Sequence, residues 1–193
     1  TSPGASASAP GGAAITFTWD GAAPSTTVTV PAQNARLAAG AAVFSGGYGD
    51  NAANGNPSGV NRVEVLLERK SDNLFWDGSA WGAQPDNWPD ATTDGLGGWT
   101  WTSPVFSENN VSFTLLTRAC DNTGTVATTD CDLGAKDANY ENTFAVAVNS
   151  ITFIVDTAAP ASAVATPGAA YANALPTVAG TGTDNVAIAN SQL

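Results

Sequence analysis

The sequence predicts an all-β protein, a β-sandwich of about seven antiparallel strands. Apolar and polar side chains alternate over short stretches, which is the period of a strand with one face on a core. Gly, Pro, Asn, Asp, Ser and Thr gather between these stretches, as turns require. No stretch longer than about ten residues has the apolar periodicity of a helix.

The chain begins with a segment that we expect to be flexible. Residues 1–12 carry no apolar side chain larger than Ala, and they are rich in Pro, Gly and Ser. Residues 13–20 follow as a strand that cannot bury its apolar face alone. We therefore expect 1–23 to hold a flexible lead-in and the closing strand of a preceding module.

A complete module is expected over residues 24–156. The clearest strand is 60–69, in which Val63, Val65 and Leu67 face one way and polar residues mostly face the other. The turn Asp77-Gly78 predicts a tight hairpin with Trp76 and Trp81 on its arms. The other strands are expected at 25–30, 37–47, 98–102, 111–119 and 144–156.

One phrase occurs twice and divides the chain. Ile151–Pro160 (ITFIVDTAAP) repeats Ile15–Pro24 (ITFTWDGAAP) at a constant spacing of 136 residues. A strand followed by Asp, two Ala and Pro, repeated at a fixed spacing, is typical of tandem modules. After Pro160 the pattern starts again, so we expect 157–193 to hold the first strands of a following module.

These phrases resemble a known family. The segments VAGTGTDNV at 178–186, WDGSAW at 76–81, CDNTG at 120–124 and FIVDTAAP at 153–160 are similar to the bacterial Ig-like repeat domains of cell-surface adhesins and stalk proteins. The resemblance covers about 24–193. It implies an Ig-like sandwich in a tandem array, an extracellular or cell-surface location, and a spacer, adhesive or filament-building role.

The resemblance also implies Ca²⁺ at the junctions between modules. Ca²⁺ takes six to eight oxygen ligands from carboxylates, amides and carbonyls. We expect one site from Asp156 with the turns Asp121-Asn122 and Asp184-Asn185, and an earlier site from Asp20 with Asp50-Asn51. The plainer alternative is that these Asp and Asn residues only form turns.

Composition excludes several classes of function. The 193 residues include 17 acids and 6 bases, a formal net charge of −11, which disfavours nucleic acid as a partner. No apolar run is long enough to predict membrane insertion. The chain has no histidine, so Ser–His and Cys–His catalysis is excluded within it, and we expect no enzyme.

The cysteines predict one local disulfide. Cys120 and Cys131 are the only two in the chain, and a disulfide suits an extracellular protein better than two free thiols. A zinc site is disfavoured because too few ligands remain to complete it.

Tryptophans are the candidate ligand contacts. Exposed indoles stack on sugars or fill pockets of partner proteins, and we expect Trp88 to be the most exposed, with Trp76 and Trp81 as further candidates. Trp99 and Trp101 share one face of a strand and are expected to pack in the core.

Three functions follow as expectations. The first is a structural module whose partners are neighbouring Ig-like modules, or identical subunits joined by strand exchange. The second is an adhesin module that binds surface glycans or proteins. The third is an accessory module of a secreted polysaccharide-degrading enzyme.

Overall fold

The protein is all-β in its computed structural model, which describes residues 17–51, 56–83, 87–123, 131, 139–166, 174 and 177–184. No helix occurs in these residues. The described part therefore contains no helix of the length and apolarity that a membrane crossing needs.

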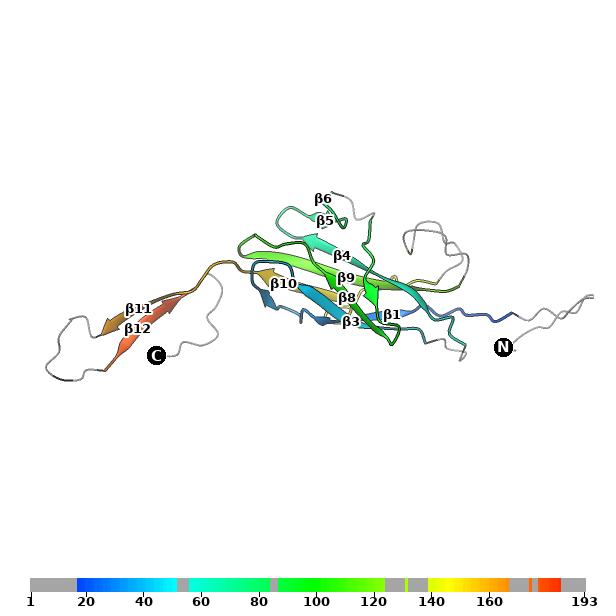
Figure 1. The fold of residues 1–193 in the computed structure, drawn as a ribbon, viewed down its shortest axis with the longest axis horizontal. Coiled ribbons are helices and arrows are strands. Elements are labelled where there is room, and N and C mark those ends of the chain that lie inside the picture. Colours follow the sequence, from blue (N-terminus) through cyan, green and yellow to red (C-terminus); the bar gives the residue numbers. More distant parts are fainter. Residues whose placement is uncertain are drawn as a thin grey trace, which may run out of the picture.

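Three sheets make up the structure (Figure 1). The four-stranded sheet has the order β1 (Ser25–Val30), β3 (Val43–Gly49), β8 (Gly98–Thr102), β7 (Thr92–Thr93). The six-stranded sheet has the order β2 (Arg36–Leu37), β10 (Ser150–Val155), β9 (Val111–Asp121), β4 (Val60–Arg69), β5 (Leu74–Trp76), β6 (Trp81–Gly82). The third sheet pairs β11 (Ala161–Thr166) with β12 (Ala179–Thr183).

The two larger sheets enclose one hydrophobic core, so this part is sandwich-like. As expected from the period of two, alternate residues of β4, β9 and β10 point inward and are buried. Trp99 and Trp101 of β8 fill the opposite side, which confirms their predicted packing role. The predicted hairpin is also present, since Trp76 pairs with Trp81 across β5 and β6.

The closing strand is shorter than predicted. A strand was expected from 144, but β10 begins only at Ser150. The amides of Val148, Asn149 and Ser150 all donate to the carbonyl of Ala145, and the Asn149 side chain accepts from the Ala145 amide at 2.7 Å. This tight turn, with Ala147 at φ 63°, prevents the extended backbone that alternation alone predicted.

Part of the outer face of the six-stranded sheet is buried too, beyond what the sequence suggested. Glu64 of β4 is buried and accepts a hydrogen bond from Arg118 of β9 at 2.8 Å. The chain at 87–91 covers this pair, because Val65 donates to the carbonyl of Pro89 and Ala91 donates to that of Val63. The other oxygen of Glu64 accepts the amide of Cys131, whose disulfide with Cys120 is formed as predicted, with a Cα–Cα distance of 5.6 Å.

The chain enters and leaves the sandwich at opposite ends. Figure 1 shows the N-terminal segment running into β1 at one end and the hairpin β11–β12 lying beyond the other. All residues of β11 and β12 are exposed, and among the described residues the two strands pair only with each other.

Candidate metal centre

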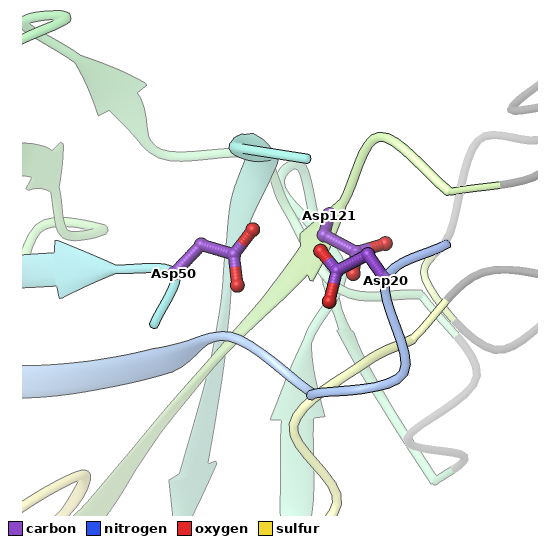
Figure 2. Close-up of side chains that lie close together, drawn as sticks. All are labelled: Asp20, Asp50 and Asp121. Carbon is purple, nitrogen blue, oxygen red and sulfur yellow. The ribbon is translucent and has the colours of Figure 1, made fainter. Parts of the chain in front are cut away.

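Three aspartates from distant parts of the chain meet at the end where the chain enters the sandwich. Asp20 precedes β1, Asp50 follows β3 and Asp121 ends β9. Each offers a carboxylate oxygen, and these oxygens lie within 4.8 Å of one another. Figure 2 shows the three side chains converging.

Strand pairing brings these residues together. Ser25 pairs with Gly49 across β1 and β3, which places the start of β1 beside Asp50. Val60 pairs with Asp121 across β4 and β9, so the loop before β4 lies beside the end of β9. The cluster is therefore a product of two long-range registers, not of a local motif.

Asp121 is the most buried of the three, with no solvent exposure. Its Oδ1 accepts the amide of Thr123 at 2.9 Å and the hydroxyl of the same residue at 2.6 Å. Its Oδ2 accepts the side-chain amide of Asn139 at 2.9 Å. These contacts fix the orientation of the carboxylate in the cluster.

Asp20 is held as firmly, at 8% exposure. Its Oδ1 accepts the amide of Ala22 at 3.1 Å and its Oδ2 accepts the amide of Ser58 at 2.7 Å. Burial acts to raise the pKa of Asp20, but the hydrogen bonds from Ser58 and Ala22 outweigh it, so the pKa lies below its usual value. The side chain is thus held in the charged form that a cation requires.

Asp50 is the least satisfied. Its Oδ2 accepts the amide of Gly59 at 2.8 Å, while its Oδ1 is buried with no hydrogen-bond partner among the described residues. Burial, and then the negative charges of Asp20 and Asp121, raise the pKa of Asp50 against the opposing bond from Gly59. A buried carboxylate oxygen without a donor is costly, and a cation would satisfy it.

The arrangement suits a hard cation. Carboxylate oxygens are the ligands that Ca²⁺ prefers, and its coordination shell is flexible enough to include carbonyls and water. Within the described part of the chain, the Lys and Arg ion pairs involve other acids and none of these three aspartates. Three clustered carboxylates repel one another unless a proton or a cation intervenes, and the described residues place no Lys or Arg in an ion pair with them.

The structure groups the predicted site residues differently from the sequence analysis. Asp20 and Asp50 do lie together, as expected. The predicted meeting of Asp121 with Asp156 is wrong, because β9 and β10 are antiparallel and Val155 pairs with Val111. Asp156 follows one end of that pair and Asp121 lies at the other end of β9, where it joins Asp20 and Asp50.

The remaining predicted ligands have other places. The side-chain amide of Asn122 donates to the carbonyls of Ser58 and Gly59 at 3.1 and 2.9 Å, so it holds the loop before β4. Asp184 follows β12, and its Oδ1, like that of Asp50, is buried without a partner among the described residues. Asn185 lies outside the described residues.

Trp88 was expected to be exposed, and this is wrong. It is 9% exposed because the pairing of 87–91 with β4 draws it over the sheet. The Arg118 guanidinium lies 4.0 Å from the centroid of its ring, and Phe144 stacks on it at 5.8 Å. Trp76 and Trp81 are half-buried, pack edge to face at 5.4 Å, and are also poor candidates for ligand contact.

The exposed indole is one that the sequence analysis did not select. Trp19 is 70% exposed, beside an open hollow of about 980 Å³ at the aspartate cluster. The hollow is lined by Thr18–Gly21, Asn56–Ser58, Asn122, Thr123 and Asn139. The repeated phrase could have drawn attention to Trp19, because it places this residue at the position of the buried core residue Val155.

Two further residues of this site, Ser58 and Asn139, were also not predicted from the sequence. Both bond to Asp20, Ser58 through its backbone amide and Asn139 through its side chain. Neither carries a local signal, because each is positioned by a loop whose place depends on distant strands.

Compared with models of known protein families and with curated proteins, the sequence matches none of them.

Proposed function

We propose that the chain is a section of a tandem array of Ig-like β-sandwich modules, a structural part of an extracellular surface or filament protein, with Ca²⁺ bound at the junctions. The two-sheet, all-β architecture and the disulfide support the Ig-like and extracellular parts of this proposal. The tandem part depends on one comparison within the chain.

That comparison is between the hairpin β11–β12 and the pair β1–β3. Ser25 pairs with Gly49 in β1–β3, and Ala161 pairs with Thr183 in β11–β12. Each pairing then has one irregularity at the same step, between Val28 and Val30 in β1 and between Val164 and Thr166 in β11. The spacing of 136 residues relates these positions in β1 and β11.

A glycine marks the same place in both pairs. A Cβ on Gly46 would collide with the carbonyl of Thr27, and one on Gly180 would collide with that of Ala163. Asp50 and Asp184 each follow the second strand of their pair, and each has a buried oxygen without a partner among the described residues. The agreement of register, irregularity, glycine and unsatisfied aspartate is the observation that carries the proposal.

In this proposal, calcium is what holds a linker to the module that follows it. An ion held by Asp20 from the entering linker, and by Asp50 and Asp121 from the sandwich, would tie the linker to the module that follows it. The second junction would use Asp156 and Asp184 in the places of Asp20 and Asp50. The geometry of an acid from the linker beside acids from the module is what a junction site needs.

Strand exchange between identical subunits has weaker support. β10 pairs with β9 and β2, so a donated closing strand needs partners equivalent to these. The hairpin β11–β12 corresponds to β1 and β3, and therefore offers neither. The glycan-binding alternative is also weaker, because Trp88, its main predicted contact, is buried on the outer face of the sheet.

Calcium titration by calorimetry, paired with thermal unfolding in calcium and in chelator, tests the metal site. Extracellular modules bind Ca²⁺ with dissociation constants of about 10⁻⁴–10⁻³ M. Calcium at one hundred times that constant should stabilise the fold by about 2.7 kcal/mol. Asp121→Asn should abolish the gain, while Asp90→Asn, which removes an exposed acid away from the cluster, should retain it. No heat and no stabilisation at calcium concentrations one hundred times that constant would overturn the metal site.

The array itself is tested on the native polypeptide. Intact mass and peptide sequencing should find neighbouring modules that carry the same strand–Asp–x–Ala–Ala–Pro phrase. Flanking sequence without this phrase on either side would contradict the tandem arrangement, whatever the calcium result.

A further inference from the structure

The chain has two linkers, residues 20–24 before the sandwich and residues 156–160 after it. The first shows how a linker joins the module that follows it, and the second shows how a linker leaves the module that precedes it. Both linkers make the same local turn. Oδ1 of Asp20 accepts the amide of Ala22 at 3.1 Å, and Oδ1 of Asp156 accepts the amide of Ala158 at 3.1 Å. One half can therefore be mapped onto the other, residue by residue.

The entering linker shows how the following module holds a linker. The amide of Ser58 donates to Oδ2 of Asp20 at 2.7 Å, and the side chain of Asn139 donates to the Asp20 carbonyl at 3.2 Å. Pro24 is buried against the sandwich. The corresponding Pro160 is exposed, since the hairpin β11–β12 alone offers nothing that covers it.

The leaving linker shows how the preceding module holds it. The amide of Asp156 donates to the carbonyl of Leu37 at 2.9 Å. Oδ1 of Asn109 then accepts the amides of Thr157 and Ala158 at 3.1 and 3.2 Å. Three successive linker amides are thus held by the end of the sandwich that the chain is leaving. In the entering linker, the described residues provide the amide of Gly21, the counterpart of Thr157, with no such acceptor.

We infer that each junction is a rigid end-to-end interface in which one linker is held from both sides. The preceding module contributes the counterparts of Leu37 and Asn109, and the following module contributes those of Ser58 and Asn139. The partner that fits the open hollow beside Asp20 is accordingly the end of another module of the same kind, with its Asn109 counterpart on the amides of Gly21 and Ala22. This inference rests on the proposed tandem arrangement and deepens it, because it names the two faces that meet.

Asn109 has a specific part in this interface. It acts on the linker backbone through one side-chain oxygen, and it is separate from the three aspartates at the other end of the sandwich. It therefore sets the direction in which the next module leaves, independently of any cation. Only Ala159 and Pro160 separate this clamp from β11, and the ring of Pro160 restricts the backbone there.

Amide exchange measured by NMR on the full chain tests the clamp. In Asn109→Ala, the amide of Thr157 should exchange about tenfold faster, the effect of losing one modest hydrogen bond. The amide of Ala158 should exchange faster by a smaller factor, because Oδ1 of Asp156 still accepts it. Asn109→Asp keeps the acceptor oxygen and should restore the protection. Asn142→Ala, an exposed Asn whose one described side-chain bond is to Thr143, should leave both rates unchanged.

The measurement is repeated in calcium and in chelator. The effect of Asn109 should be the same in both, so it remains readable even if the metal site fails its own test. The amides of Ala22 and Ser58 serve as internal references and should not respond to Asn109→Ala. Unchanged exchange at Thr157 and Ala158 in Asn109→Ala, or wild-type rates there equal to those of an unstructured peptide, would overturn the clamp.

Discussion

Asp50 shows most clearly that the described residues alone do not satisfy the aspartate cluster. Asp20 and Asp121 each have both carboxylate oxygens engaged by donors. Asp50 has one oxygen on the Gly59 amide and one buried oxygen with no donor among the described residues. In the absence of a cation, the three charges oppose folding at this end of the sandwich.

The variant Asp50→Asn tests how much the repulsion between the three carboxylates destabilises the fold. A raised pKa means that the folded state binds the proton more tightly than the unfolded chain does. The contribution of Asp50 to stability is therefore present below its unfolded pKa and is lost as pH rises through its folded pKa. In chelator at neutral pH, Asp50→Asn should raise the unfolding midpoint, because the charge is gone and an oxygen can remain for Gly59.

The same variant separates the metal effect from the charge effect. The affinity of Asp50→Asn for calcium should be at least about tenfold lower than that of the wild type, because one anionic ligand is lost. Thermal unfolding over a pH series, with and without calcium, measures both effects. If wild type and Asp50→Asn have identical pH profiles in chelator, the repulsion described above does not operate.

At the scale of elements, Gly46 decides whether β1 can approach β3. A Cβ at this position would overlap the carbonyl of Thr27 and lie 2.7 Å from the Trp99 ring. The indole nitrogen of Trp99 donates to that same Thr27 carbonyl at 3.1 Å, so β1, β3 and β8 meet at one tight point. Glycine is required there because the strands are closely packed.

Two glycine variants of one strand test this packing. Gly46→Ala should destabilise the sandwich by about 3 kcal/mol, the upper range of overpacking costs. Gly49→Ala, also in β3, meets no atom within 4 Å and should change stability by less than about 0.5 kcal/mol. Urea unfolding gives both values, and equal effects of the two variants would contradict the close approach.

The strap at 87–91 is a second element with a clear physical role. Trp88 covers Arg118, which in turn neutralises the buried Glu64, so the strap keeps water from an ion pair on the outer face. A broken buried ion pair is strongly destabilising, whereas an intact pair contributes little by itself. Covering this pair, and not ligand contact, therefore accounts for the position of Trp88.

A pair of tryptophan variants tests the strap. Trp88→Ala should cost about 3 kcal/mol, as expected for a large aromatic removed from a packed site. Trp19→Ala should leave the stability of the isolated chain nearly unchanged, because its side chain is 70% exposed. Acrylamide quenching should fall in Trp19→Ala and not in Trp88→Ala. The reverse pattern would show that Trp88 is the accessible indole after all.

At the scale of the whole molecule, the sandwich and the hairpin β11–β12 are unequal parts. The sandwich has a single core closed by residues from both of its sheets. Every residue of the hairpin's two strands is exposed, including Val164 at the position that corresponds to Val28 of the sandwich. Such a hairpin adds no buried apolar surface to the core.

Removing the hairpin should therefore not destabilise the sandwich. A chain that ends after Pro160 should keep its unfolding midpoint within about 2 °C, the shift expected for a few tenths of a kcal/mol. Differential scanning calorimetry of both chains gives this comparison. A large drop in the midpoint would mean that the hairpin packs on the sandwich and that the two are not separate parts of an array.

Much of the fold was predictable because it depends on local patterns. The inward faces of β4, β9 and β10 follow from alternation of side chains, and the hairpin at Trp76–Trp81 follows from its Asp-Gly turn. The short strands β2 and β7 were not predicted. Each has two residues, which is too few for a period to show, and each forms only because a longer strand lies beside it.

The sequence by itself determined the all-β class, the inner faces of the main strands, the disulfide partners and the repeated strand–Asp–Ala–Ala–Pro phrase. The tertiary structure alone decided that Asp121 joins Asp20 and Asp50, and which tryptophan is covered. The reason is that alternation and turn residues act over a few neighbours, whereas convergence depends on the direction and register of strands that are far apart in the chain. The pairing of β1 with β3 and of β4 with β9 brings Asp20, Asp50 and Asp121 together, and the antiparallel pairing of β9 with β10 keeps Asp121 away from Asp156.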